Sequence, residues 1–128
     1  MRRLFLTLAA AAALAGLTLP ALAGELPYDK AGFDKALAAG QPVIVDFAAD
    51  WCPTCKAQKP IVQGLLAQKK LAPVTLFVAD FDKETALKKQ LGVTMQSTFV
   101  VFKAGKEIGR STGQTQKEAL SALFDKAL

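Results

Sequence analysis

The 128-residue chain has two cysteines, Cys52 and Cys55, and only two residues separate them. A disulfide across so short a loop stabilises a fold little, and a chain of this size can bury a sufficient core without one. The spacing does suit thiol–disulfide exchange, in which one thiolate attacks a substrate disulfide and the second thiol resolves the mixed disulfide. We therefore expect Cys52 and Cys55 to form a redox-active disulfide.

The predicted secondary structure around the pair favours nucleophilic chemistry. Residues 42–48 are apolar except for Asp46, as in a strand buried on both faces, and a helical pattern follows over residues 52–70. Free N–H groups and the dipole at a helix N-terminus stabilise a thiolate. Cys52 is therefore predicted to be the exposed, attacking sulfur, and Cys55, one turn further along, the resolving sulfur.

Two other uses of the cysteine pair are a static structural disulfide and half of a metal site. A zinc site normally needs four Cys or His ligands, and this chain has two Cys and no His. A metal or an iron–sulfur cluster would therefore need a second chain and outside ligands. That binding module stays an alternative to the redox interpretation, which we favour and which requires no cofactor.

Helical patterns flank this strand–helix unit on both sides. Residues 29–39 predict a helix, and Asp82 is a candidate N-cap for another that ends at residue 91. Pro60 predicts a kink in the helix that carries the cysteines, because proline lacks the N–H that the helix needs. Thr115 begins a capping-box pattern for a last amphipathic helix. Three residues of that helix are expected to face inward: Leu120, Leu123 and Phe124.

Further strands complete the pattern. Residues 74–81 predict a second buried strand, and residues 98–102 and 107–111 predict two short strands joined by a hairpin. The early strand–helix–strand unit requires parallel strands, whereas the closing hairpin adds antiparallel ones. The predicted fold class is α/β, with a mixed central sheet flanked by helices.

The first residues have the pattern of an export signal. Arg2 and Arg3 precede an uncharged, Ala- and Leu-rich stretch, and Ala21 and Ala23 supply small residues for a peptidase. We expect a signal peptide over residues 1–23, cleaved after Ala23, and one domain over residues 24–128, which indicates a periplasmic location. A retained membrane anchor is the alternative, since the uncharged stretch barely reaches the roughly 20 residues that a spanning helix needs.

The charge of the chain excludes one class of partner. The formal net charge is +5, and it falls to +3 when Arg2 and Arg3 leave with the leader. The imbalance is mild and spread along the chain, with no basic block of the kind that binds nucleic acid. We expect no nucleic-acid partner.

The segment around the cysteines resembles the active site of the thioredoxin superfamily. Val45 to Cys52 (VDFAADWC), followed by Cys55-Lys56 and Pro60, is similar to that family's active-site strand, motif and kinked helix. The resemblance covers nearly all of residues 24–128 and lacks only the short first strand that many members have. It implies the thioredoxin fold and dithiol–disulfide exchange without a bound cofactor.

The same resemblance implies roles for single residues. Cys52 and Cys55 match the redox pair, and Asp46 matches a buried carboxylate that accepts the proton of Cys55. The alternative for Asp46 is a strand residue bonded to nearby backbone. The residues expected to contact a substrate are Trp51, Pro53, Thr54, Gln96 and Ser97.

Three positions depart from the family's pattern. Pro53-Thr54 replaces the Gly-Pro of cytosolic thioredoxins, so the motif does not separate reducing from oxidising members. Val78 stands where a lysine often faces the buried carboxylate, and Asp46 is then expected to have a raised pKa. Ser97 stands where the family has a cis-proline.

The serine changes the expected backbone. A cis peptide bond before a residue other than proline costs roughly 2.5–4 kcal/mol. We therefore expect a trans Gln96–Ser97 bond, a loop of altered shape, and the Ser97 N–H or hydroxyl available near Cys52. A donor there would lower the pKa of the Cys52 thiol.

The function expected from the sequence is an exported thiol–disulfide oxidoreductase. No His lies between the cysteines, which favours a reductase, because an imidazolium there would stabilise the thiolate and make an oxidant. A membrane electron transporter would supply electrons, and disulfides of exported proteins would receive them. A monomer is expected. A disulfide oxidase or isomerase is the alternative, although its known versions carry an extra domain or segment for which residues 24–128 leave no room.

Overall fold

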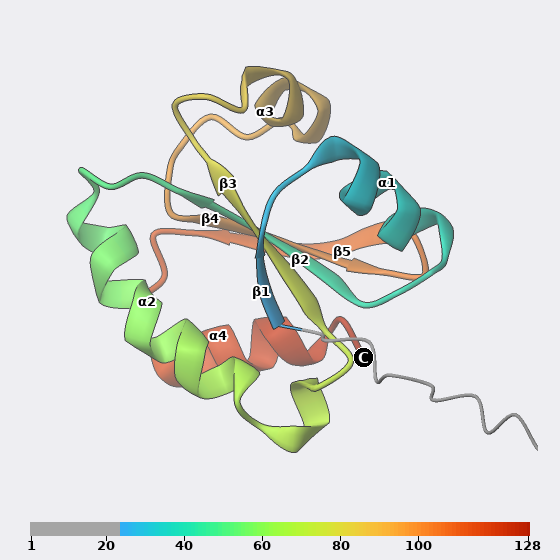
Figure 1. Cartoon of the computed structure of the whole chain (residues 1–128). Coiled ribbons are helices and arrows are strands. Elements are labelled where there is room, and N and C mark those ends of the chain that lie inside the picture. The colour runs from blue at the N-terminus through green and yellow to red at the C-terminus, as the bar shows by residue number, and fades with distance from the viewer. Residues whose placement is uncertain (1–23) are drawn as a thin grey trace, which may run out of the picture.

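The computed structural model describes residues 24–128, so the predicted leader and its cleavage site lie outside the described residues. Five strands form one sheet in the order β1-β3-β2-β4-β5 (Figure 1). β1, β2 and β3 are parallel, while β4 is antiparallel to β2 and to β5. The strands are β1 (Gly24–Pro27), β2 (Val43–Ala48), β3 (Thr75–Asp80), β4 (Thr98–Lys103) and β5 (Lys106–Thr112).

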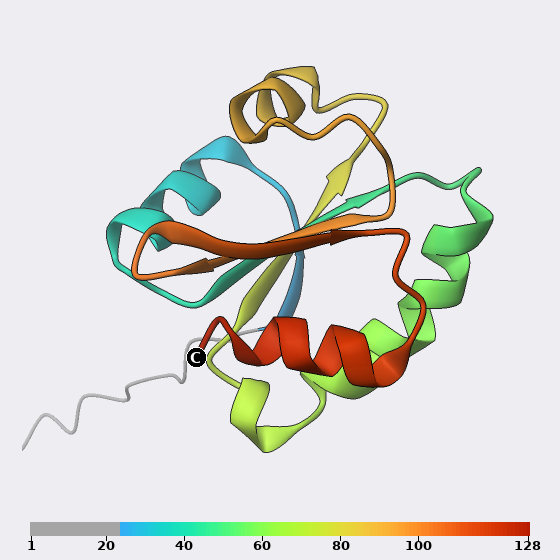
Figure 2. The ribbon, with the colours of Figure 1, turned by 180° about the vertical axis from the view of Figure 1, so that it is seen from behind.

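Helices cover both faces of this mixed sheet. α1 (Lys30–Ala38) and α3 (Thr85–Leu91) lie on one face, and α2 (Pro53–Leu66) and α4 (Lys117–Asp125) lie on the other (Figures 1 and 2). A short 3-10 helix (Lys69–Leu71) follows α2. The predicted α/β class and mixed sheet are confirmed. In the part of the chain that the structure describes, no helix combines the length and apolar character needed to cross a membrane.

The expectation that the first strand is missing was wrong. β1 pairs in parallel with β3, in a register from Gly24 opposite Thr75 to Pro27 opposite Val78. Its sequence, GELP, has no apolar alternation and contains two residues that are uncommon in strands. Such a strand is tolerated because it lies at the edge of the sheet. Its backbone pairing, rather than its side-chain pattern, defines it.

Two predicted helix starts were also wrong. α3 begins at Thr85 instead of after Asp82, because a turn comes first, in which the Asp80 carboxylate accepts the backbone N–H groups of residues 82 and 83. α4 has Gln116 at its N-cap, and no capping bond from the Thr115 side chain is seen. α2 ends at Leu66, several residues earlier than expected.

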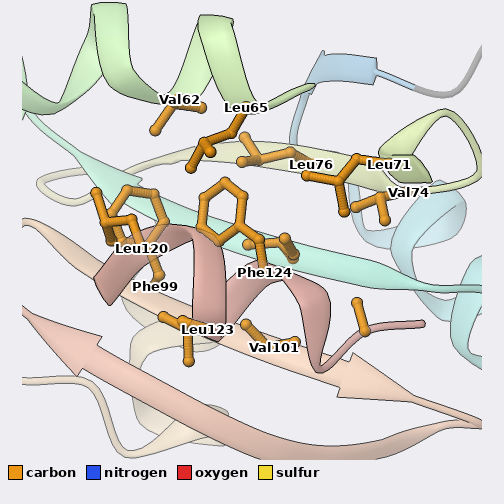
Figure 3. Close-up of a cluster of buried hydrophobic side chains, with 12 residues drawn as sticks. Val62, Leu65, Leu71, Val74, Leu76, Phe99, Val101, Leu120, Leu123 and Phe124 are labelled. Carbon is orange, nitrogen blue, oxygen red and sulfur yellow. The ribbon is translucent and has the colours of Figure 1, made fainter. Parts of the chain in front are cut away.

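Separate apolar clusters lie on the two sides of the sheet. One joins β2, β3 and β4 to α2 and α4 (Figure 3), and the other joins the sheet to α1 and α3. In the first cluster the rings of Phe99 and Phe124 meet edge to face at 5.4 Å. The predicted inward residues of α4, which are Leu120, Leu123 and Phe124, are all buried there. This packing holds α2 against the end of β2, where the cysteines lie.

Candidate functional site

The cysteine pair lies at the junction between β2 and α2. Cys52 is the N-cap of α2, and its sulfur accepts the backbone N–H of Cys55 at 3.1 Å. Both cysteines are free thiols in the structure. The position at a helix N-terminus is as predicted, and it supplies the N–H groups that stabilise a thiolate.

The expected exposure of the two sulfurs was wrong. Cys52 is only 1% exposed, whereas Cys55 is half-buried. Cys52 turns inward because its sulfur is held on one side by the Cys55 N–H and on the other by the hydroxyl of Ser97. An attack by the Cys52 sulfur would therefore require a local displacement of these groups.

Ser97 connects the two sulfurs. Its Oγ lies 3.0 Å from the Sγ of Cys52 and 3.1 Å from the Sγ of Cys55. Its peptide bond with Gln96 is trans, as predicted, since no cis bond occurs in residues 24–128. The Ser97 N–H donates to the Phe47 carbonyl at 2.8 Å, so only the hydroxyl of Ser97 is available to hydrogen-bond the sulfurs. Its φ of 61° is in the left-handed region, which serine adopts rarely.

The two thiols differ in acidity. Burial acts to raise the pKa of Cys52, but hydrogen bonds with Cys55, Ser97 and backbone N–H groups outweigh it and leave the pKa below its ordinary value. Burial, and then the hydrogen bond with Cys52, raises the pKa of Cys55. The pair therefore tends to hold one thiolate on Cys52 and the remaining proton on Cys55.

Asp46 lies beside the pair, on β2. It lines a cavity of about 390 Å³ together with Cys55, and its Oδ1 is buried without a hydrogen-bond partner among the described residues. Burial raises its pKa to about 7, and the charge of Glu25 on β1 adds to the effect. Val78, directly opposite on β3, has no charge that could offset the effect of burial or of Glu25. The raised pKa confirms the expectation and suits a group that exchanges a proton near neutral pH.

The other predicted residues surround the sulfurs at different depths. Trp51 is 56% exposed, and its indole N–H donates to the Asp82 carboxylate at 2.7 Å. Pro53 is exposed as the first residue of α2, and Thr54 and Gln96 are half-buried. The structure thus brings all the predicted positions to one end of the sheet. What they bind stays a prediction.

Three residues that contribute to the site were not predicted from the sequence. They are Glu25, which lines the cavity, Asp82, which holds Trp51, and Gln58, which is buried on α2. Gln58 could have been noticed, because a polar residue three positions after Cys55 interrupts the apolar face of the helix. In the described part of the chain, no three Cys, His, Asp or Glu side chains lie together as a metal site would require.

Comparisons with known proteins agree with this geometry. The family model described as Thioredoxin matches residues 25–126. Thioredoxin from Chlamydia muridarum (strain MoPn / Nigg) is 38% identical over 94 residues, which cover 73% of this chain and 89% of that protein. Thioredoxin H4 of Arabidopsis thaliana is 36% identical over 89 residues, which cover 70% and 73%. The crystal structure of Trxlp from Edwardsiella tarda EIB202 has a TM-score of 0.77 and 40% identity, over 79% of this chain and 98% of that one.

A mixed sheet that places two unlike thiols at a helix N-terminus defines a thiol–disulfide oxidoreductase. The chain belongs to the thioredoxin family.

Proposed function

We propose that this oxidoreductase is an exported reductase. It takes electrons from a membrane electron transporter and passes them to disulfides of proteins in the periplasm, where it works as a monomer. The observation that carries the direction is that Pro53 and Thr54, and no histidine, separate the cysteines, so no imidazolium lies there to stabilise the thiolate and favour an oxidant. The relatives that bear the name thioredoxin support the same direction.

The proposed reaction has two exchange steps. The Cys52 thiolate attacks one sulfur of a substrate disulfide, forms a mixed disulfide and releases the other substrate sulfur as a thiolate. Asp46 then accepts the proton of Cys55, either directly or through water in the shared cavity. The Cys55 thiolate attacks the Cys52 sulfur and releases the second substrate thiolate. Two electrons have moved to the substrate, and a donor dithiol restores the Cys52–Cys55 pair.

The equilibrium reduction potential of the pair tests the direction. We expect a value nearer the roughly −270 mV of thioredoxin than the roughly −120 mV of a strong disulfide oxidase. Thr54→His is the matched control, since a cation between the cysteines should stabilise the thiolate and raise the potential. A parent potential above about −150 mV would place the protein among the oxidases instead.

Export is tested by the mass of the protein recovered from the host's periplasmic fraction. Cleavage after Ala23 yields a chain that begins at Gly24 and lacks both leader arginines. Ala23→Lys should block this cleavage and leave the chain in the membrane fraction. Parent protein recovered there at its full length would instead support the retained anchor.

A further inference from the structure

Gln58 is an unusual residue for its position in the fold. It lies on the face of α2 that packs on the sheet, near the apolar Val62 and Leu65, and is only 2% exposed. A buried amide is costly unless it is hydrogen-bonded. An apolar side chain at this position would serve packing at least as well, so the contacts of Gln58 indicate what it does.

The amide of Gln58 donates to two carbonyl groups that belong to the loops beside the sulfurs. Its Nε2 lies 2.9 Å from the carbonyl oxygen of Gln114, between β5 and α4, and 3.5 Å from that of Ser97, before β4. Its Oε1 has no partner among the described residues. Both contacts are to acceptors, so the NH₂ group must point toward them and the amide has one favourable orientation.

These contacts belong to a set that surrounds Ser97. The Ser97 carbonyl also accepts the N–H of Gly113 at 3.0 Å, and the Ser97 N–H donates to Phe47 on β2. The backbone of Ser97 is thus fixed from β2, from the loop after β5 and from α2. Its hydroxyl, as a result, sits between the sulfurs of Cys52 and Cys55.

We propose that Gln58 is a positioning residue, which holds the Ser97 hydroxyl against the Cys52 sulfur by joining α2 to the carbonyls of Ser97 and Gln114. Its contribution to thiol reactivity passes through Ser97 and not through the sulfurs directly. The inference rests on the proposed function only in taking Cys52 as the attacking thiol. It is independent of the direction of electron flow and of export.

Gln58→Leu tests the proposal, because leucine fills similar space without a donor. The measurement is the rate of Cys52 alkylation by iodoacetamide across pH, with the labelled cysteine identified by tandem mass spectrometry. Loosening the hydroxyl should raise the pKa of Cys52, so the midpoint of the pH profile of alkylation should rise by about half a pH unit, which corresponds to a threefold change in the thiol–thiolate equilibrium. Gln63→Leu, which replaces an exposed glutamine on the same helix, should leave this midpoint unchanged.

The same pair of variants in a Ser97→Ala background separates positioning from a purely structural role. Without the hydroxyl, Gln58→Leu should shift the midpoint of the pH profile no further, even where it lowers stability. An equal rise of the midpoint in both backgrounds, or no rise in folded Gln58→Leu, overturns the proposal. Should Gln58→Leu fail to fold, Gln58→Met carries the same comparison. Failure of the reductase proposal would show in the reduction potential and not in these rates.

Discussion

At the scale of single residues, the Ser97 hydroxyl lies within hydrogen-bonding distance of both sulfurs, so it can donate to whichever one is ionised. Thiolates exist only in the reduced form, and a donor to them stabilises that form. Ser97→Ala should therefore favour the disulfide and make the reduction potential more negative, by roughly 15–30 mV for a three- to tenfold change in the exchange equilibrium.

The control for this measurement is Ser121→Ala, which removes a hydroxyl from α4. Its potential should match that of the parent. If the Ser97→Ala protein has the same reduction potential as the parent, the hydroxyl stabilises the oxidised and the reduced forms equally. Ser97→Pro is a poor substitute for either variant, because proline cannot adopt the observed φ of 61° and would lose the bond to Phe47.

Asp46 should make stability depend on pH. Its pKa rises from an ordinary 3.8 to about 7 on folding, so the folded state favours the protonated form. The residue is therefore neutral for stability below about pH 4, and it destabilises the fold progressively as the pH rises to about 7. Asp46→Asn should raise the free energy of unfolding at pH 8 by up to about 4 kcal/mol, at 1.36 kcal/mol per unit, and leave it unchanged at pH 4.

Urea unfolding at the two pH values measures this difference. The expected gain in the free energy of unfolding at pH 8 is an upper limit, because Asp46 is only half-buried. Asp50→Asn removes an exposed carboxylate from the same cavity and is the control variant. If the Asp46→Asn protein matches the parent at pH 8 as well, the carboxylate is hydrated in the folded state.

The division of work between the sulfurs can be tested by trapping. Cys55→Ser should accumulate mixed disulfides with substrate proteins, because Cys52 attacks and nothing releases the adduct. Cys52→Ser should form far less, despite the greater exposure of Cys55, because burial still raises the pKa of Cys55 when Cys52 is replaced. Non-reducing electrophoresis measures the adducts. More adduct with Cys52→Ser than with Cys55→Ser would reverse the assignment.

At the scale of secondary-structure elements, α4 matters to the site because it packs beside α2 on the same face of the sheet (Figure 3). Phe124 is fully buried and contacts Phe99. Phe124→Ala should lower the free energy of unfolding by about 3–5 kcal/mol, as measured by denaturant titration. Lys117→Ala, on the exposed side of α4, should change it by less than about 0.5 kcal/mol.

Hydrophobic periodicity was enough to predict most elements, because β2, β3 and β4 are nearly continuous apolar runs and the helices are amphipathic. It failed for β1, whose pairing is set by β3 rather than by its own side chains. It also failed for two helix starts. The α3 start was misplaced because the Asp80 carboxylate holds a turn that propensities do not describe.

The chemistry of the site was predictable where it is local in sequence. The positions of Cys52, Cys55 and Asp46 follow from one strand and one helix. The burial of Cys52 was not predictable, because it depends on a hydroxyl 45 residues further along the chain. The role of Gln58 was not predictable for the same reason, because its partner Gln114 is 56 residues away.

At the scale of the whole molecule, the site is assembled from three parts of the chain that meet at one end of the sheet. The junction of β2 and α2 supplies the sulfurs, the segment before β4 supplies the hydroxyl, and the loop after β5 supplies the carbonyl that Gln58 contacts. The apolar clusters on the two faces hold these parts together. A substitution in either cluster can therefore alter thiol reactivity without touching a sulfur.

Trp51 is the chain's single tryptophan and precedes Cys52 directly. Its bond to Asp82 joins positions 31 residues apart and restrains an indole that is otherwise largely in solvent. The protein thus contains a single indole fluorophore, placed beside its redox centre and held in a defined orientation. Disulfides quench indole emission at short range, so the oxidation of the pair can be followed optically in the unlabelled protein, with no background from a second tryptophan.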